Sequence, residues 1–63
     1  MKNNILRLRK KKKLSLKDLS DKSGVSGGYI WLLEKGHRKN PSADMMIRIA
    51  DALDENFKNV WRM

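Results

Sequence analysis

Residues 16–33 read LKDLSDKSGVSGGYIWLL and contain the signals of two short helices joined by a tight turn. Ser15 is placed to cap the first helix, and Asp18 follows three residues later, as in a shortened capping box. Gly24 ends that helix at a position where a left-handed backbone is often needed. Ser26 is placed to cap the next helix. The stretch therefore predicts a helix of about two turns, a reversal at the glycine, and a second helix.

Further helices are predicted on both sides of this unit. Ile5, Leu6 and Leu8 mark an amphipathic helix before it, and apolar residues at helical spacing follow Ser42. No segment alternates between apolar and polar residues with the period of two that is typical of a strand. We therefore expect an all-α fold, a compact domain of five helices around one core. The expected helices cover about residues 3–13, 16–23 and 27–35, then a segment capped by Ser42 that contains Met46, Ile49, Ala50 and Leu53, and a short last helix capped by Asn56 that contains Phe57, Val60 and Trp61.

A chain of 63 residues without cysteine is bounded to one domain, residues 1–63, stabilised by apolar packing. His37 is the only histidine and falls in a predicted loop, and the sequence has no metal-ligand cluster and no glycine-rich phosphate loop after a strand. We therefore expect no metal, no cofactor and no enzyme. The longest apolar run, from Tyr29 to Leu33, is too short to span a bilayer. The N-terminal segment lacks the long apolar core of a secretory signal. These features predict a soluble, cytoplasmic protein.

The net charge of +8 is concentrated at the start of the chain. Residues 1–17 contain eight basic side chains and no acidic one, whereas the remaining residues contain seven of each. Such a field attracts a polyanion or an anionic membrane. A membrane-surface peptide is the weaker interpretation, because the few apolar residues of the first helix are needed by the core. The lysine run at 10–13 equally fits a surface whose charges serve solubility.

The two helices of residues 16–33 form a helix-turn-helix motif. In this motif the second helix enters the major groove of DNA, and its first turns reach the edges of the bases. The turn has to be short so that the first helix holds the second at a constant angle, and a glycine there reverses the backbone without a Cβ clash.

The segment LSLKDLSDKSGVSGGYIWLLEKGHRKNPSADMMIRIADAL, residues 14–53, resembles the Cro and phage-repressor, or xenobiotic-response-element, class of helix-turn-helix regulators. The elements LSLKDLS, GVS, YI, LEKG, NPS and IADAL carry the resemblance at the spacings of that family. Ile5, Arg9 and Val60 also stand in family-like places. The resemblance implies a lambda-repressor-like fold and a transcription regulator, with repression as the favoured role. It also implies binding to double-stranded DNA as a homodimer on a two-fold symmetric operator.

The resemblance also implies roles for individual residues. Arg9 and Glu34 occupy the positions of an ion pair between the first helix and the end of the third, the alternative being two independent surface charges. The positions that face the bases are Ser26, Gly27, Gly28, Trp31 and Leu32. The positions that contact phosphates are Ser15, Leu16, Lys17, Lys35, His37, Arg38, Lys39 and Asn40.

The base-facing positions depart from the family, which commonly has polar residues there. Gly27 and Gly28 have no side chain for a base edge, so they either allow a close approach to DNA or form a tolerant, frayed first turn. Trp31 can contact a thymine methyl group, a sugar or a partner protein, or it can cap the core. We therefore expect DNA shape and dimer spacing to carry a larger share of specificity than is usual.

A protein-interaction module, antitoxin-like or an anti-regulator, is the alternative function. It would use an apolar patch of Leu16, Trp31 and Leu32 on the same scaffold. The sequence leaves open the operator, repression against activation, the oligomeric state, and whether residues 1–63 are the DNA-binding part of a longer regulator. It also leaves open a dimer contact around Phe57, Val60 and Trp61, which equally fit the core.

Overall fold

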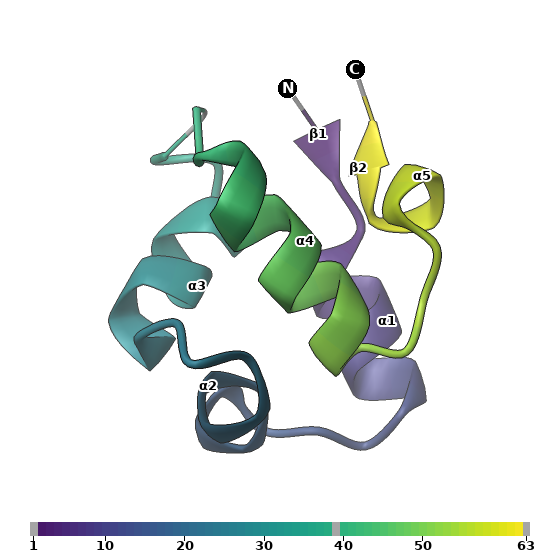
Figure 1. The fold of residues 1–63 in the computed structure, drawn as a ribbon. Coiled ribbons are helices and arrows are strands. Elements are labelled where there is room, and N and C mark those ends of the chain that lie inside the picture. The colour runs from purple at the N-terminus through teal and green to yellow at the C-terminus, as the bar shows by residue number, and fades with distance from the viewer. Residues whose placement is uncertain (1, 39, 63) are drawn as a thin grey trace.

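Five helices and one short antiparallel strand pair make up the protein in a computed structural model, which describes residues 2–38 and 40–62 (Figure 1). The elements in chain order are β1 (Lys2–Asn3), α1 (Ile5–Lys11), α2 (Leu16–Ser23), α3 (Gly27–Glu34), α4 (Ala43–Ala52), α5 (Phe57–Val60) and β2 (Trp61–Arg62). The predicted all-α fold with five helices is confirmed.

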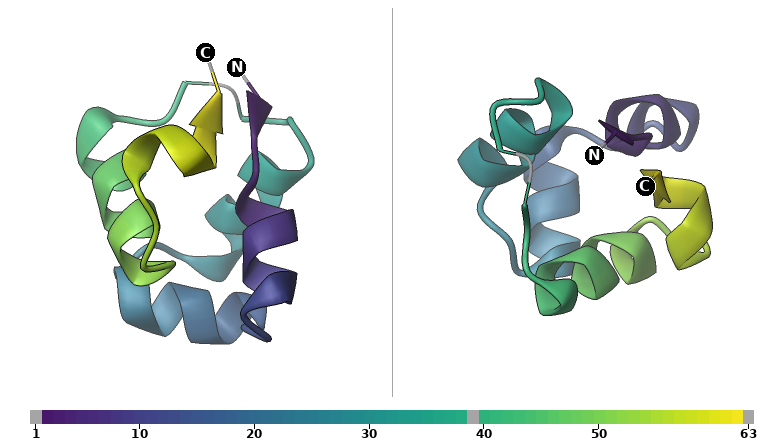
Figure 2. Two further views of the ribbon diagram at one scale, coloured as in Figure 1. Left: turned by 90° about the vertical axis from the view of Figure 1, so that its right-hand side faces the viewer. Right: turned by 90° about the horizontal axis from the view of Figure 1, so that it is seen from above.

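The strand pair was not predicted. Lys2 pairs with Arg62 and Asn3 with Trp61, so the two ends of the described chain lie side by side (Figures 1 and 2). A strand of two residues is too short to show any alternation, which is why its sequence carries no signal. Because β1 takes residues 2 and 3, the first helix begins at Ile5, and the predicted start at residue 3 was wrong.

The other helix boundaries depend on caps. Helix α2 has the bounds that were predicted, and α3 ends one residue earlier than expected, at Glu34. Ser42 caps α4 by accepting a hydrogen bond from the backbone N–H of Met45 at 3.1 Å. Asn56 stands at the N-cap position of α5 as predicted, but its side chain makes no capping hydrogen bond.

One apolar core lies between the helices, and its largest fully buried members come from all five helices and the residue that follows α4. Trp61 is buried and donates its indole N–H to the carbonyl of Met46 in α4 at 3.0 Å. Val60 is also buried, so these two residues belong to the core, whereas Phe57 remains partly exposed. The buried apolar residues are Ile5, Leu8, Leu19, Val25, Ile30, Leu33, Met46, Ile49, Ala50, Leu53, Val60 and Trp61.

Candidate nucleic-acid interface

The start of α2 is closed by a reciprocal capping box. The hydroxyl of Ser15 accepts a hydrogen bond from the backbone N–H of Asp18 at 2.9 Å, and the carboxylate of Asp18 accepts one from the backbone N–H of Ser15 at 3.0 Å. The hydrogen bond from the backbone N–H of Ser15, followed by a smaller contribution from the Ser15 side chain, favours the charged carboxylate and lowers the pKa of Asp18. The cap leaves Ser15 exposed at the start of the helix.

The turn between α2 and α3 depends on Gly24. Its φ of 75° lies in the left-handed region, and a Cβ there would meet a guanidinium nitrogen of Arg48 at 3.3 Å. Ser26 then caps α3 by accepting from the backbone N–H of Tyr29 at 3.1 Å. The two caps and the glycine hold α3 against α2 at a set angle, as the motif requires.

Helix α3 has a buried face and an exposed face. Ile30 and Leu33 are buried, whereas 43% of Trp31 is exposed to solvent. Trp31 is therefore no cap of the core, and that alternative is excluded. Gly28 has no atom within 4 Å of an added Cβ, so nothing inside the protein requires a glycine there. Gly27 faces α2, but its nearest contacts would be at an ordinary 3.9 Å.

The residues after α3 fold back beside Trp31. The backbone N–H groups of His37 and Arg38 donate to the carbonyl of Leu32 at 2.9 and 3.3 Å. The His37 ring centroid lies 6.1 Å from that of Trp31, and the ammonium nitrogen of Lys35 lies 6.0 Å from the Trp31 centroid. The first distance suits a contact between tilted aromatic rings, and the second lies at the limit for a cation–π interaction. The fold thus gathers an indole, an ammonium and an imidazole at one end of α3.

The residues expected at phosphates have different surroundings. Lys17 is exposed and donates to Asp21 at 2.9 Å, a hydrogen bond that raises the pKa of Lys17. Leu16 is partly buried and packs against the core, so only part of its side chain is open to solvent. Asn40 is exposed, as are Lys35, His37 and Arg38, whereas Lys39 lies outside the described residues.

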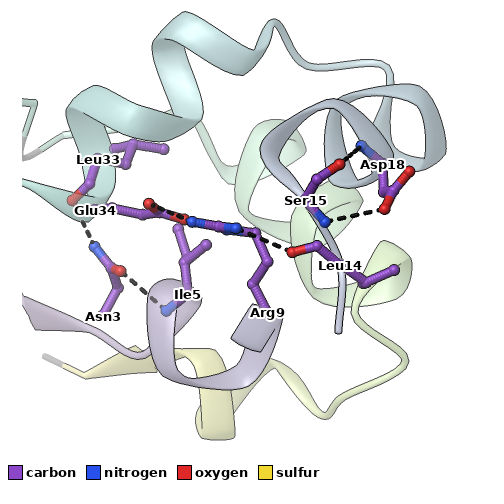
Figure 3. A network of polar contacts seen from close by, with 8 residues as sticks. All are labelled: Asn3, Ile5, Arg9, Leu14, Ser15, Asp18, Leu33 and Glu34. Carbon is purple, nitrogen blue, oxygen red and sulfur yellow. Dashed lines mark hydrogen bonds and ion pairs between the residues drawn. The ribbon is translucent and has the colours of Figure 1, made fainter. Parts of the chain in front are cut away.

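The expected ion pair between Arg9 and Glu34 is present and has two hydrogen bonds (Figure 3). Nε and Nη2 of Arg9 donate to the two carboxylate oxygens of Glu34 at 2.8 and 3.2 Å. Nη1 of Arg9 donates to the carbonyl of Leu14 at 3.0 Å. The side chains are only 13% and 2% exposed. Arg9 therefore joins α1, the last residue of α3 and the segment before α2.

Sequence reasoning missed Asn3, which also reaches α3. Its amide nitrogen donates to the carbonyl of Leu33 at 3.0 Å, and its amide oxygen accepts from the backbone N–H of Ile5 at 3.1 Å (Figure 3). The second bond is an Asx turn, a local signal that an asparagine before a helix can give. The first joins residues 30 positions apart, and no local pattern predicts it.

A capped helix, a glycine turn and a second helix with an exposed face define a helix-turn-helix DNA-binding domain. A helix-turn-helix family model matches residues 5–58, and the chain belongs to this family, of the Cro and phage-repressor type. The protein is accordingly a DNA-binding transcription regulator with double-stranded DNA as its partner, and the family is not one of enzymes. A comparison with curated proteins gives no match. Within residues 2–38 and 40–62, no helix is both long and apolar enough to cross a membrane.

Proposed function

We propose that this chain is a sequence-specific repressor that binds a two-fold symmetric operator as a homodimer. Residues 27–35 enter the major groove, and the base-facing positions are Ser26, Gly27, Gly28, Trp31 and Leu32. The observation that carries the proposal is the outer face of α3, where an exposed indole at Trp31 stands beside open space at Gly28. The two glycines of α3 offer no polar side chain to the bases, and Trp31 offers a large apolar ring. Such a helix suits recognition of the shape of the groove and contact with thymine methyl groups.

Phosphates on both sides of the groove are held by the flanking residues. The basic side chains in this role are those of Lys17, Lys35, Arg38 and Lys39. Ser15, Leu16, His37 and Asn40 complete the set, with Leu16 acting through its backbone because its side chain packs on the core. The first N–H groups of capped helices are suited to phosphate oxygens. The capped starts of α2 and α4 supply such groups.

The test is selection from a random duplex pool at moderate salt, followed by sequencing of the retained DNA. Enrichment of a two-fold symmetric motif is expected, with affinity that falls steeply as salt rises because bound phosphates release counterions. Retained DNA without enrichment would contradict sequence reading by α3. A motif without two-fold symmetry would contradict the dimer.

Matched variants distinguish residues that recognise the base sequence from residues that contact the phosphates. Trp31→Ala should change the preferred sequence, whereas Ile47→Ala, at an exposed apolar residue of α4, should leave it unchanged. Lys35→Gln should weaken binding to all duplexes alike, and Lys58→Gln, which removes the same charge from α5, should do so far less. A uniform loss at Trp31 with unchanged preference would contradict its reading role.

A protein-interaction module is the second candidate, and the exposed indole of Trp31 is the observation that favours it. The partner would cover Trp31, Leu32 and the exposed part of Leu16, whose side chain otherwise packs on the core. Failure to bind any duplex at low salt, together with a saturable complex with a protein that Trp31→Ala abolishes, would support this candidate over the repressor.

A further inference from the structure

Helix α3 depends on contacts outside itself for its position. It has only eight residues, and two of them are the glycines of its first turn. So short a helix is marginal on its own, and glycine lowers helix propensity further. Its first turn is held by the Ser26 cap, and Glu34 at its last turn is held by Arg9.

Asn3 makes a second contact with the last turn of α3. The amide nitrogen of Asn3 donates to the carbonyl of Leu33, which lacks an α-helical partner at the helix end and also accepts from the backbone N–H of Gly36 at 3.1 Å. The amide oxygen accepts from the N–H of Ile5. Reversing the amide would set N–H against N–H and oxygen against oxygen, so these two partners determine its orientation.

The backbone of Asn3 is itself held by the core of the molecule. It pairs with Trp61 in the β1–β2 ladder, and the next residue, Asn4, donates its N–H to the carbonyl of Val60 at 2.8 Å. Trp61 is fastened in turn to Met46 of α4 by its indole N–H. The Asn3 amide therefore joins the end of α3 to a segment that is itself hydrogen-bonded to α5 and β2.

We infer that Asn3 is a positioning residue for DNA reading: its amide holds the end of α3 and thereby sets the direction in which Trp31 and Lys35 face the groove. The inference rests on the proposed function of α3 as the reading helix. Trp31 and Lys35 stand two residues before and after Leu33, so a shift of this carbonyl moves both side chains. Sequence recognition depends on such supporting bonds within the protein, because a small displacement of a base-contacting side chain weakens its contact with DNA.

The test uses two neighbouring asparagines that make the same kind of bond to different helices. Asn3→Asp keeps an oxygen for the Ile5 N–H but removes the donor to Leu33. Asn4→Asp is the control, because the Asn4 amide donates to the carbonyl of Asn59 in α5, away from α3. Both variants add the same charge. Asn3→Ser, which is uncharged and too short to reach Leu33, replaces Asn3→Asp if the latter does not fold.

The readout is the ratio of affinities for the selected duplex and for a scrambled duplex of equal length, at one salt concentration and at a temperature where circular dichroism shows each variant folded. Asn3→Asp should lower this ratio by up to about fivefold, the factor reached if the net free energy of one hydrogen bond is lost from the specific complex alone. Asn4→Asp should weaken both complexes alike and leave the ratio unchanged. An equal ratio in wild type and both Asn3 variants would overturn the inference.

Hydrogen exchange of the free protein tests the same contact without DNA. The amides of Lys35, Gly36 and His37 donate to carbonyls of Trp31, Leu33 and Leu32 and report on the end of α3. They should exchange faster in Asn3→Asp than in Asn4→Asp at equal global stability. Unchanged exchange would overturn the inference. A wild-type protein that does not discriminate between duplexes would instead contradict the proposed function, and the exchange rates would still decide the role of Asn3.

Discussion

Two arginine–carboxylate pairs of this chain have similar lengths but very different surroundings. Arg9 and Glu34 are bonded at 2.8 Å with side chains 13% and 2% exposed. Arg48 and Asp44 are also bonded at 2.8 Å, but they are 54% and 74% exposed within one helix. Water screens the second pair, so distance alone does not measure what an ion pair contributes.

Removing one partner of the buried pair should therefore destabilise the protein more than removing both. Arg9→Met leaves the Glu34 carboxylate buried without its partner and should lower the free energy of unfolding by about 3 kcal/mol. Arg9→Met combined with Glu34→Leu should cost less, because no unpaired charge remains. Urea unfolding measures both values. Arg48→Met is the control, with an expected loss below about 0.5 kcal/mol, and equal losses at Arg9 and Arg48 would contradict this account.

The Asp18 carboxylate should make stability depend on pH in the acid range. Its pKa in the folded protein is lowered from 3.8, so the unfolded chain binds its proton first as pH falls. The stabilisation is fully present above pH 3.8 and is lost as pH falls through the lower folded-state pKa. The difference in melting temperature between wild type and Asp18→Asn should therefore be constant near neutral pH and shrink below pH 3.8. A difference that stays constant down to the acid limit would contradict the capping role of the charge.

At the scale of the element, Gly24 and Gly28 of the helix-turn-helix unit differ in whether the fold requires a glycine there. Gly24 has a positive φ that side chains rarely adopt and a guanidinium in its way. Gly28 has an ordinary helical backbone and open space around it. The fold requires a glycine at position 24, whereas no contact within the protein requires one at position 28.

Alanine substitutions should separate these two glycines. Gly28→Ala should stabilise the protein by up to about 1 kcal/mol, because alanine favours the helix and meets no neighbour. Gly24→Ala should destabilise it by more than about 1 kcal/mol. If α3 approaches DNA closely at Gly28, the more stable variant should bind its operator more weakly in titrations. Unchanged binding would favour a merely tolerant first turn.

At the scale of the whole molecule, the lysine run at residues 10–13 lies apart from the helices that read DNA in the proposed function. The lysines before α2 lie outside the helix-turn-helix unit, and Lys12 is bonded to Glu55 at 3.2 Å rather than free for DNA. This bond lowers the pKa of Glu55, because the ammonium stabilises the carboxylate. Lys10, Lys11 and Lys13 are exposed and contribute to the field of the molecule.

Neutralising exposed lysines of this run should slow association with DNA more than it speeds dissociation. Lys10→Gln with Lys11→Gln removes long-range attraction while leaving the contacts of α3 in place. Stopped-flow measurements should show a slower association rate at low salt and a difference that vanishes at high salt. A changed dissociation rate at all salt concentrations would show instead that these lysines make fixed contacts.

The sequence by itself determined the helix-turn-helix unit and the start of α4. Ser15, Gly24, Ser26 and Ser42 act on backbone groups within three or four residues of themselves, so their effects can be seen in a linear chain. The helical spacing of Met46, Ile49, Ala50 and Leu53 likewise predicted the buried residues of α4 and the residue after it. These local rules bounded α2 correctly and placed α3 to within one residue.

The tertiary structure alone decided which of the two tryptophans is buried and how the ends of the chain meet. Trp61 lies in the core and Trp31 on the surface, although both stand beside apolar residues in the sequence. The β1–β2 pair and the bond from Asn3 to Leu33 join residues that are far apart in the chain. Such contacts depend on the packing of the helices, because their partners are brought together by the core and not by spacing along the chain.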